Sequence, residues 1–286
     1  MIPQILMNSL ITGSIYACIA FGFSLVYGTM GFFNMGYGAY VLIGAYLFYT
    51  LYRLLHVPLI LAGLLACAVS MALWLAVDRL CYYRFRQKRV PSWTSVVISM
   101  AIATFCTAVI TILFSSGKKV VYPGIPISIS LGSVRFTSIQ LISVVVTLAL
   151  MLGMNVFLKK TELGKRIRAI SNDKTMAQVV GIDLEATYRW VIGIGAALSA
   201  VAGVLMSLDS DLRPTVASRS LLYAILVSIV GGSGNITGAW IAGILLGFTE
   251  NVTVIFIGSG WREAISLALI IIFMLVKPSA FGGNED

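Results

Sequence analysis

The sequence predicts an all-α integral membrane protein with about eight transmembrane helices and one further short or re-entrant helix. Two observations predict this class. First, 59% of the 286 residues are hydrophobic and only 11% are charged, whereas about a quarter of the residues in an ordinary soluble domain are charged. Second, the apolar residues gather into runs of about 20, the length that an α-helix needs to cross the hydrocarbon core of a bilayer.

Runs of this length occur along the whole chain. They predict spans at 4–28, 36–52, 57–77, 94–115, 139–158, 188–207, 236–257 and 263–278. A further apolar run at 219–230 is only about a dozen residues long. That length is typical of a half-helix that enters the membrane part way, or of a strongly buried short span.

The distribution of lysine and arginine predicts the orientation. If the polar residues 159–189 face the cytoplasm, residues 78–93 face it too, and together with Lys277 these stretches hold 13 of the 20 basic residues. Because basic residues concentrate on the cytoplasmic side of membrane proteins, we expect the N-terminus outside and the C-terminus inside. The net charge of +9 then follows from topology, and nucleic acid is not an expected partner.

The predicted outer connections are short. Residues 116–138 contain prolines, glycines and alternating apolar residues, a pattern that indicates a turn and short strands. Residues 208–218 are polar enough to cap an opening. Since neither connection is long enough to form a folded domain, we expect a partner to bring any soluble domain.

The longest polar interruption, residues 161–189, combines charge, helix-capping residues and an amphipathic pattern. Asn172 or Asp173 can cap a short helix near 173–180. The apolar side chains of that helix share one face, and a glycine followed by an apolar residue ends it. The residues of this face and end are Met176, Val179, Val180, Gly181 and Ile182. The interruption is either a docking site for a soluble motor protein or a solvated loop.

The basic stretch before the short helix suits a cytoplasmic membrane surface and contains Gly164, Lys165, Arg166 and Arg168.

Two glycine-rich breaks occupy corresponding places in the two halves of the chain. The first contains Asn34, Gly36 and Gly38, and the second contains Gly231, Gly232, Gly234 and Asn235. Paired breaks of this kind indicate a binding region near the bilayer midplane, because backbone that leaves the helix there must line a cavity or be buried in protein. The alternative is a pair of tight turns at the membrane edge.

Small residues also recur at four-residue spacing, and they predict close helix packing. They are Gly195, Ser199 and Gly203, then Gly234 with Gly238, and Gly243 with Gly247.

Catalytic motifs are missing from the sequence. HExxH, GxSxG and GxxxxGK[ST] do not occur. The single histidine, His56, has no cluster of metal-ligating residues near it in sequence, and the four cysteines show no paired spacing. Glu250 is the carboxylate placed clearly inside a predicted span, where such groups can mark proton paths. We therefore expect no ATPase site, metal site or other enzyme activity in this chain.

The chain resembles the inner-membrane permeases of branched-chain, or hydrophobic, amino acid ABC importers. The residues that carry the resemblance are TELGKRIRAISNDKTMAQVVGID followed by GIGAALSAVAGVL, together with FNMGYGAYVLIGAY, VGGSGNITGAWIAGILLGFTE and the closing VKPSAFG. The resemblance covers most of the chain. Its length is similar to that of the shorter permease of the two that such complexes contain.

The resemblance implies one transmembrane permease domain over residues 1–286, with a cytoplasmic coupling loop at 159–189, in the bacterial inner membrane. It implies a second homologous permease, two ATPase subunits that bind ATP and Mg²⁺, and a periplasmic solute-binding protein. This chain would itself hold no cofactor. The ATPase-coupling residues would be Gly164, Arg168, Ala169, Asn172, Asp173, Met176, Ala177, Val179, Val180, Gly181 and Ile182. The two glycine-rich breaks would border the substrate pathway.

Two alternatives to an amino acid importer remain at this point. One is a proton-coupled secondary transporter of a small neutral solute, which would use Glu250. The other is an ABC permease for urea or short amides. An intramembrane enzyme is a third possibility that the missing motifs disfavour.

Overall fold

The computed structural model describes residues 2–88, 91–121, 128–131, 134–232 and 234–276. The helices are α1 (Ile2–Met30), α2 (Tyr37–Tyr49), α3 (Leu59–Val77), α4 (Tyr83–Gln87), α5 (Ser92–Phe114), α6 (Ser138–Lys160), α7 (Glu162–Asn172), α8 (Lys174–Val179), α9 (Leu184–Asp209), α10 (Val216–Gly231), α11 (Ile236–Phe256) and α12 (Arg262–Val276). Three short helices join them: η1 (Thr50–Leu54), η2 (Asp78–Tyr82) and η3 (Ser259–Trp261). Strands β1 (Ser128–Leu131) and β2 (Val134–Thr137) form an antiparallel hairpin.

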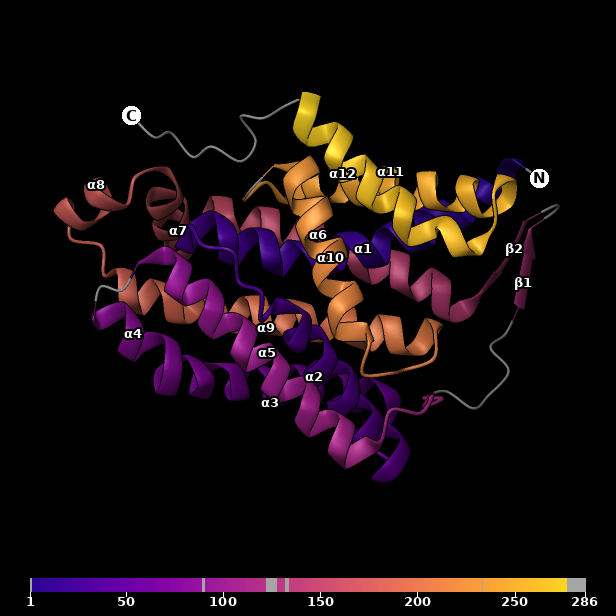
Figure 1. Cartoon of the computed structure of the whole chain (residues 1–286), viewed down its shortest axis with the longest axis horizontal. Coiled ribbons are helices and arrows are strands. Elements are labelled where there is room, and N and C mark those ends of the chain that lie inside the picture. The colour runs from indigo at the N-terminus through magenta and orange to yellow at the C-terminus, as the bar shows by residue number, and fades with distance from the viewer. Residues whose placement is uncertain (1, 89–90, 122–127, 132–133, 233, 277–286) are drawn as a thin grey trace.

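The predicted all-α class and the short strands at 116–138 are confirmed. Each predicted span corresponds to a helix, and in the described part of the chain six helices are long and apolar enough to cross a membrane. Three further apolar helices in the described part of the chain are shorter: α2 has 13 residues, α12 has 15 and α10 has 16. In Figure 1, α10 crosses the long helices steeply. The closing VKPSAFG, including Lys277, lies outside the described residues.

Two segments expected to be loops are helical. The helix that begins with α3 continues through η2 and α4 as far as Gln87. Its charged residues do not end it because Asp78, which is fully buried, accepts a hydrogen bond from Arg86 at 2.7 Å. The polar residues 162–172, expected only as a basic approach, form α7.

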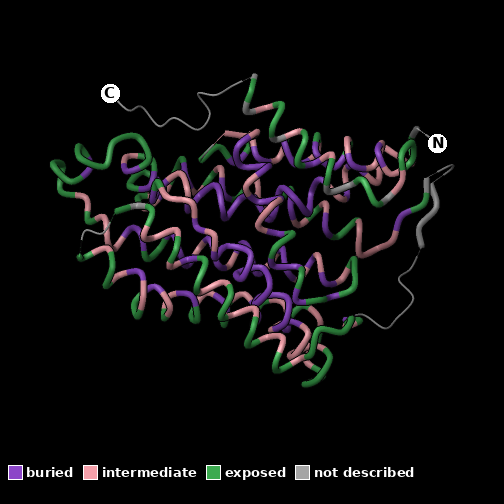
Figure 2. Tube along the Cα trace, viewed as in Figure 1, coloured by how far each residue is buried: buried purple, intermediate pink, exposed green. Residues whose placement is uncertain are grey.

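The core lies around α1, which contacts α6, α9, α10 and α11. Figure 2 shows that the buried residues run through the middle of the bundle while the exposed ones lie on its periphery. Glycines let the backbones approach: a β-carbon on Gly13 would stand 2.5 Å from the Ile244 Cα, and one on Gly247 would stand 2.6 Å from the Gly13 N. The predicted packing role of the small residues is therefore confirmed at Gly243 and Gly247, and in α9 a β-carbon on Gly203 would meet the Val41 carbonyl at 2.4 Å.

The bundle has two distinct ends. In Figure 1, α4, α7 and α8 lie at one end, and the N-terminus and the β1–β2 hairpin lie at the other. At the hairpin end, Gln4 exchanges hydrogen bonds of 2.7 and 2.8 Å with the backbone of Arg135. The polar connections thus fall into the two groups that the basic residues predict.

The connections at the hairpin end are tied to each other. Lys119 and Leu212 form an antiparallel bridge, and the Lys118 amine lies 2.9 Å from the Asp211 carboxylate. The hydrogen bond from Lys118 lowers the pKa of Asp211. A segment before α6 is therefore joined to the connection between α9 and α10.

Candidate functional site

Within the polar residues 161–189, two consecutive helices, α7 and α8, form what we call the polar segment, and the last residues of the stretch already belong to α9. The Thr161 hydroxyl caps α7 by accepting a hydrogen bond from the Gly164 amide at 3.0 Å. Ile167 and Ile170 are buried on one face, while Arg168 is exposed. A β-carbon on Gly164 would stand 2.4 Å from the Phe157 carbonyl oxygen. Only a glycine lets α7 lie this close to the end of α6, so α7 is fixed to the bundle.

The short helix predicted near 173–180 is confirmed as α8. The Asp173 carboxylate caps it, accepting from the amides of Thr175 at 2.8 Å and Met176 at 2.9 Å. At its other end Gly181 adopts a φ of +86°. The Ile182 amide bonds back to the Ala177 carbonyl at 3.0 Å, which is the pattern of a Schellman cap. The local sequence therefore determines both ends of this helix.

The apolar face of α8 is exposed to solvent. Met176, Val179 and Val180 are 62%, 77% and 78% exposed, while Ala177 on the opposite face is 4% exposed and packs toward the bundle. Figure 1 shows α8 at the outermost point of its end of the molecule. Three large apolar side chains thus lie together on an exposed face of a polar stretch.

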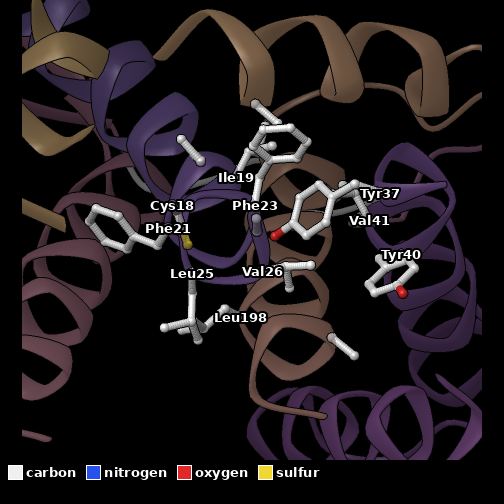
Figure 3. Packing of buried hydrophobic residues seen from close by; sticks show 14 of the residues in the cluster. Cys18, Ile19, Phe21, Phe23, Leu25, Val26, Tyr37, Tyr40, Val41 and Leu198 are labelled. Atoms are coloured by element: carbon white, nitrogen blue, oxygen red, sulfur yellow. The ribbon is translucent and has the colours of Figure 1, made fainter. Parts of the chain in front are cut away.

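The first glycine-rich break folds back along α1. Gly31 has a φ of +69° and ends α1. The Phe33 ring then packs against the ring of Tyr27, with 4.4 Å between their centroids. At the first position of α2, the Tyr37 ring meets the ring of Phe23 edge-on at 5.4 Å, as Figure 3 shows. Phe23 lies seven residues, or about 10 Å of helix, before the end of α1. Thus α2 begins well inside the bundle.

Hydrogen bonds hold the first break in place. Asn34 is 2% exposed, and its carboxamide oxygen accepts from the Gly36 amide at 2.9 Å and from the Tyr82 hydroxyl at 3.4 Å. The Met35 amide donates to the Ser99 hydroxyl at 2.9 Å. Backbone that has left the helix is therefore satisfied by a side chain from α5 and by Asn34 of the break itself, and Tyr82 of η2 holds the Asn34 side chain in place.

The second break is a tight turn between α10 and α11. Gly232 and Gly234 have φ values of +87° and +77°. The Asn235 side chain caps α11 by accepting from the Gly238 amide at 3.0 Å, and the Gly234 amide donates to the Ser24 hydroxyl of α1 at 2.8 Å. Non-helical backbone is thus confirmed in both breaks, although Gly38 and Gly231 themselves lie within α2 and α10.

A cavity of about 620 Å³ brings part of the polar segment to the second break. Predicted residues from both regions line it: Arg168, Ala169 and Asn172 from α7, and Gly234 and Asn235 from the turn. The rest of the wall comes from α1, α6 and α7, through Leu25, Thr29, Leu158, Ile167 and Ser171. The residues of the first break do not line this cavity, and the apolar face of α8 points elsewhere.

Sequence reasoning missed a partly buried ion cluster beside the polar segment. The Arg86 guanidinium lies 2.7 Å from Asp78 and 2.9 Å from Glu185, and it stands over the ring of Tyr188 at 5.7 Å. The cluster joins the end of the long α3–α4 helix to the start of α9. The positions of Asp78 and Arg86, eight residues apart, could have suggested a pair, but nothing in the sequence indicates Glu185 as the third member.

Glu250 lies fully buried where α1, α11 and α12 meet. The Tyr16 hydroxyl donates to its carboxylate at 2.6 Å, and the Ser266 hydroxyl donates to the other carboxylate oxygen. The Tyr16 ring stacks on that of Tyr223 in α10, with 4.0 Å between centroids. The carboxylate thus connects helices from the two ends of the sequence.

Comparison with known proteins identifies the family. A sequence model described as "Branched-chain amino acid transport system / permease component" matches residues 5–274. The chain belongs to this permease family. It is 27% identical to the high-affinity branched-chain amino acid transport system permease protein BraD of Pseudomonas aeruginosa, in an alignment that covers 99% of this chain and 96% of the relative.

Other permeases align over similar lengths. The protein LivH of Escherichia coli K12 is 26% identical over 99% of this chain and 96% of its own length. A probable branched-chain amino acid transport permease LivH of Methanocaldococcus jannaschii is 25% identical over 99% and 93%. The family match over residues 5–274 and the six described helices that are long and apolar enough to cross a membrane make this permease a multi-pass membrane protein.

Proposed function

We propose that this chain is a transmembrane subunit of an ABC importer for branched-chain, hydrophobic or neutral amino acids. The observation that carries the proposal is the family match over residues 5–274. Curated relatives of nearly equal length that are named as branched-chain amino acid transport permeases support it. In this proposal the chain forms the substrate pathway, and partner ATPase subunits bind ATP and Mg²⁺ and supply the energy.

The complex contains a second homologous permease, two ATPase subunits and a solute-binding protein on the outer side. The two glycine-rich breaks border the pathway, and the cavity beside Asn172 and Asn235 forms part of its inner end. Selectivity is tested by purifying the complex and reconstituting it in liposomes. Leucine uptake that requires internal ATP supports the proposal. Uptake driven by a proton gradient without ATP contradicts it. Preferential uptake of urea would show that urea, and not an amino acid, is the substrate.

The protein lies in the bacterial inner membrane with the α7–α8 end in the cytoplasm and the N-terminus outside. The concentration of lysine and arginine near that end supports this orientation. A cysteine introduced at the exposed Asp173 tests it, in a background in which the four native cysteines are replaced. An impermeant thiol reagent should label this variant only after the inner face is opened. Labelling in intact cells would show that this end of the protein lies outside and that the proposed orientation is wrong.

The exposed face of α8 docks into a groove on an ATPase subunit. Helices that dock in this way present apolar anchors at positions i, i+3 and i+4, the spacing of Met176, Val179 and Val180. Full burial of each side chain contributes about 1.5–3 kcal/mol before the costs of association are subtracted. The contact therefore accounts for a substantial part of the binding free energy.

A double substitution tests this contact. Met176→Asp with Val180→Asp should release the ATPase and abolish uptake, while the permease still inserts and folds. The matched control is Lys165→Asp with Gln178→Asp, which changes exposed polar positions of the same segment. Co-purification of the ATPase with the Met176/Val180 variant at the wild-type ratio would rule out docking through this face.

A further inference from the structure

Lys174, the first residue of α8, connects the polar segment to α1. Its amine donates a hydrogen bond to the carbonyl oxygen of Met30, the last residue of α1, at 2.7 Å. The last carbonyls of a helix have no partners within the helix, and positive charge is favoured beside them. The last turn of α1 contains no basic residue of its own. Lys174 therefore supplies, from a distant part of the sequence, the cation that this helix end lacks.

The contact involves the glycine that follows Met30. A β-carbon on Gly31 would stand 2.5 Å from the Lys174 amine, so the amine occupies the space that a side chain at this position would fill. Although Lys174 is exposed as a whole, its amine loses water at the contact, and this desolvation lowers its pKa. The side chain thus lies across the point at which α1 ends and the first break begins.

The covalent chain leads from this contact into the first break, whose residues are held by hydrogen bonds from other elements. From Gly31 the first break reaches Met35, whose amide is held by Ser99 of α5 at 2.9 Å. Asn34, in the same break, is held by the hydroxyl of Tyr82 at 3.4 Å. A hydrogen bond tolerates only a few tenths of an ångström of stretching before it weakens. A shift of α8 by 1 Å, at the order of magnitude of interface shifts in switching proteins, would therefore move Met30, turn the flexible Lys174 side chain or break the bond between them.

We propose that Lys174 is a positioning residue that transmits displacement of α8 to the end of α1 and to the first glycine-rich break. The proposal rests on the proposed function, in which the exposed face of α8 binds an ATPase subunit. Lys174 points away from that face and toward α1. Transmission and docking are therefore assigned to different side chains of the same six-residue helix.

The test compares three substitutions in the complete importer reconstituted with its solute-binding protein. Lys174→Met keeps the length of the side chain and removes its donors, whereas Lys174→Arg keeps both the charge and the donors. Lys165→Met removes an exposed lysine of α7, whose amine lies 3.5 Å from the exposed Glu162 carboxylate. The measured quantity is the number of leucine molecules imported per ATP hydrolysed.

Lys174→Met should lower this ratio about fivefold, the factor that corresponds to a contact of about 1 kcal/mol, with the ATPase still bound at the wild-type ratio. Lys174→Arg should restore most of the loss, and Lys165→Met should leave the ratio unchanged. A wild-type ratio in Lys174→Met overturns the proposal. Loss of the ATPase from Lys174→Met also overturns it, because the residue would then act in docking. Failure of the proposed function is distinguishable, because the wild-type permease would then bind no ATPase.

Discussion

The two glycine-rich breaks look alike in sequence and differ in structure. Both contact the last two turns of α1. In the first break the Phe33 ring packs against the ring of Tyr27, and in the second the Gly234 amide donates a hydrogen bond to the Ser24 hydroxyl. Asn34, Gly36 and Gly38 in the first are buried, whereas Gly234 and Asn235 in the second are exposed. Matching composition therefore does not imply matching roles. The first break behaves as unwound backbone inside a bundle, and the second as a capped turn beside a cavity.

The largest effect should come from Gly36→Leu in the first break. A β-carbon there would stand 2.9 Å from the Asn34 carboxamide oxygen and 3.0 Å from the Ser99 carbonyl oxygen. Overpacking by even a methylene costs about 1–3 kcal/mol, and leucine adds several more atoms. Uptake per inserted molecule, measured in membrane vesicles, should fall at least tenfold. Unchanged uptake would show that the first break can accept a leucine side chain at position 36, which contradicts the close contacts at this position.

Asn34→Ala should have the next largest effect. It leaves the Gly36 amide and the Tyr82 hydroxyl without their acceptor inside the bundle. Each unsatisfied buried group costs about 1–3 kcal/mol. The purified permease should therefore unfold several degrees lower in a thermal scan. The matched control is Asn155→Ala, which removes an exposed contact with Thr237 and should shift the unfolding temperature little. Equal shifts of the unfolding temperature in the two variants would show that the buried carboxamide of Asn34 stabilises the permease no more than the exposed contact of Asn155.

Gly232→Leu in the second break should be milder than Gly36→Leu. The nearest atom to a β-carbon at this position is the Asn235 Cβ, at 3.9 Å, so there is space for a side chain. The cost is the φ of +87°, about 1–2 kcal/mol for a residue other than glycine. Uptake should be reduced but measurable, and Gly232→Asn should retain more, because asparagine tolerates this conformation better. A complete loss of uptake in both Gly232→Leu and Gly232→Asn would show that the second break is as sensitive to substitution as the first.

The smallest effect should come from Asn235→Ala. The substitution removes the cap of α11, a loss of about 1 kcal/mol, at an exposed position. Hydrogen exchange at the Gly238 amide should become roughly fivefold faster, while uptake remains near the wild-type value. Asn235→Asp retains a capping oxygen and should exchange at the wild-type rate. Slower uptake in Asn235→Ala would give the turn a larger role than its geometry suggests.

Patterns that are local in sequence predicted much of this structure. The apolar runs determine each long helix because backbone polar groups in a bilayer must be satisfied within the segment. Both ends of α8 could be read from Asp173 and Gly181, since a cap depends on residues three to four positions away. The basic residues grouped the connections correctly into two ends of the bundle.

Contacts between distant residues could not be predicted in the same way. The predicted span 57–77 stopped before Asp78 because a charged residue lowers the hydropathy of a span. The structure continues the α3–α4 helix because Arg86 pairs with the buried Asp78 carboxylate. The helix α7 was missed because its buried face is a glycine and two isoleucines among basic residues. The bond from Lys174 to Met30 spans 144 residues, and no local pattern marks it. The roles assigned to the breaks and to the polar segment stay predictions.

The hydrogen bond between Tyr16 and Glu250 also has a consequence for biosynthesis. The two residues are 234 positions apart, and translation at about 5–20 residues per second separates their appearance by roughly 10–50 s. During that interval α1 resides in the membrane without α11, with Gly13 uncovered and the Tyr16 hydroxyl lacking its carboxylate. The contacts of α1 with α11 are thus completed long after α1 itself has been made. Truncated chains that end before Glu250 should be recognised as incomplete and degraded by membrane quality control.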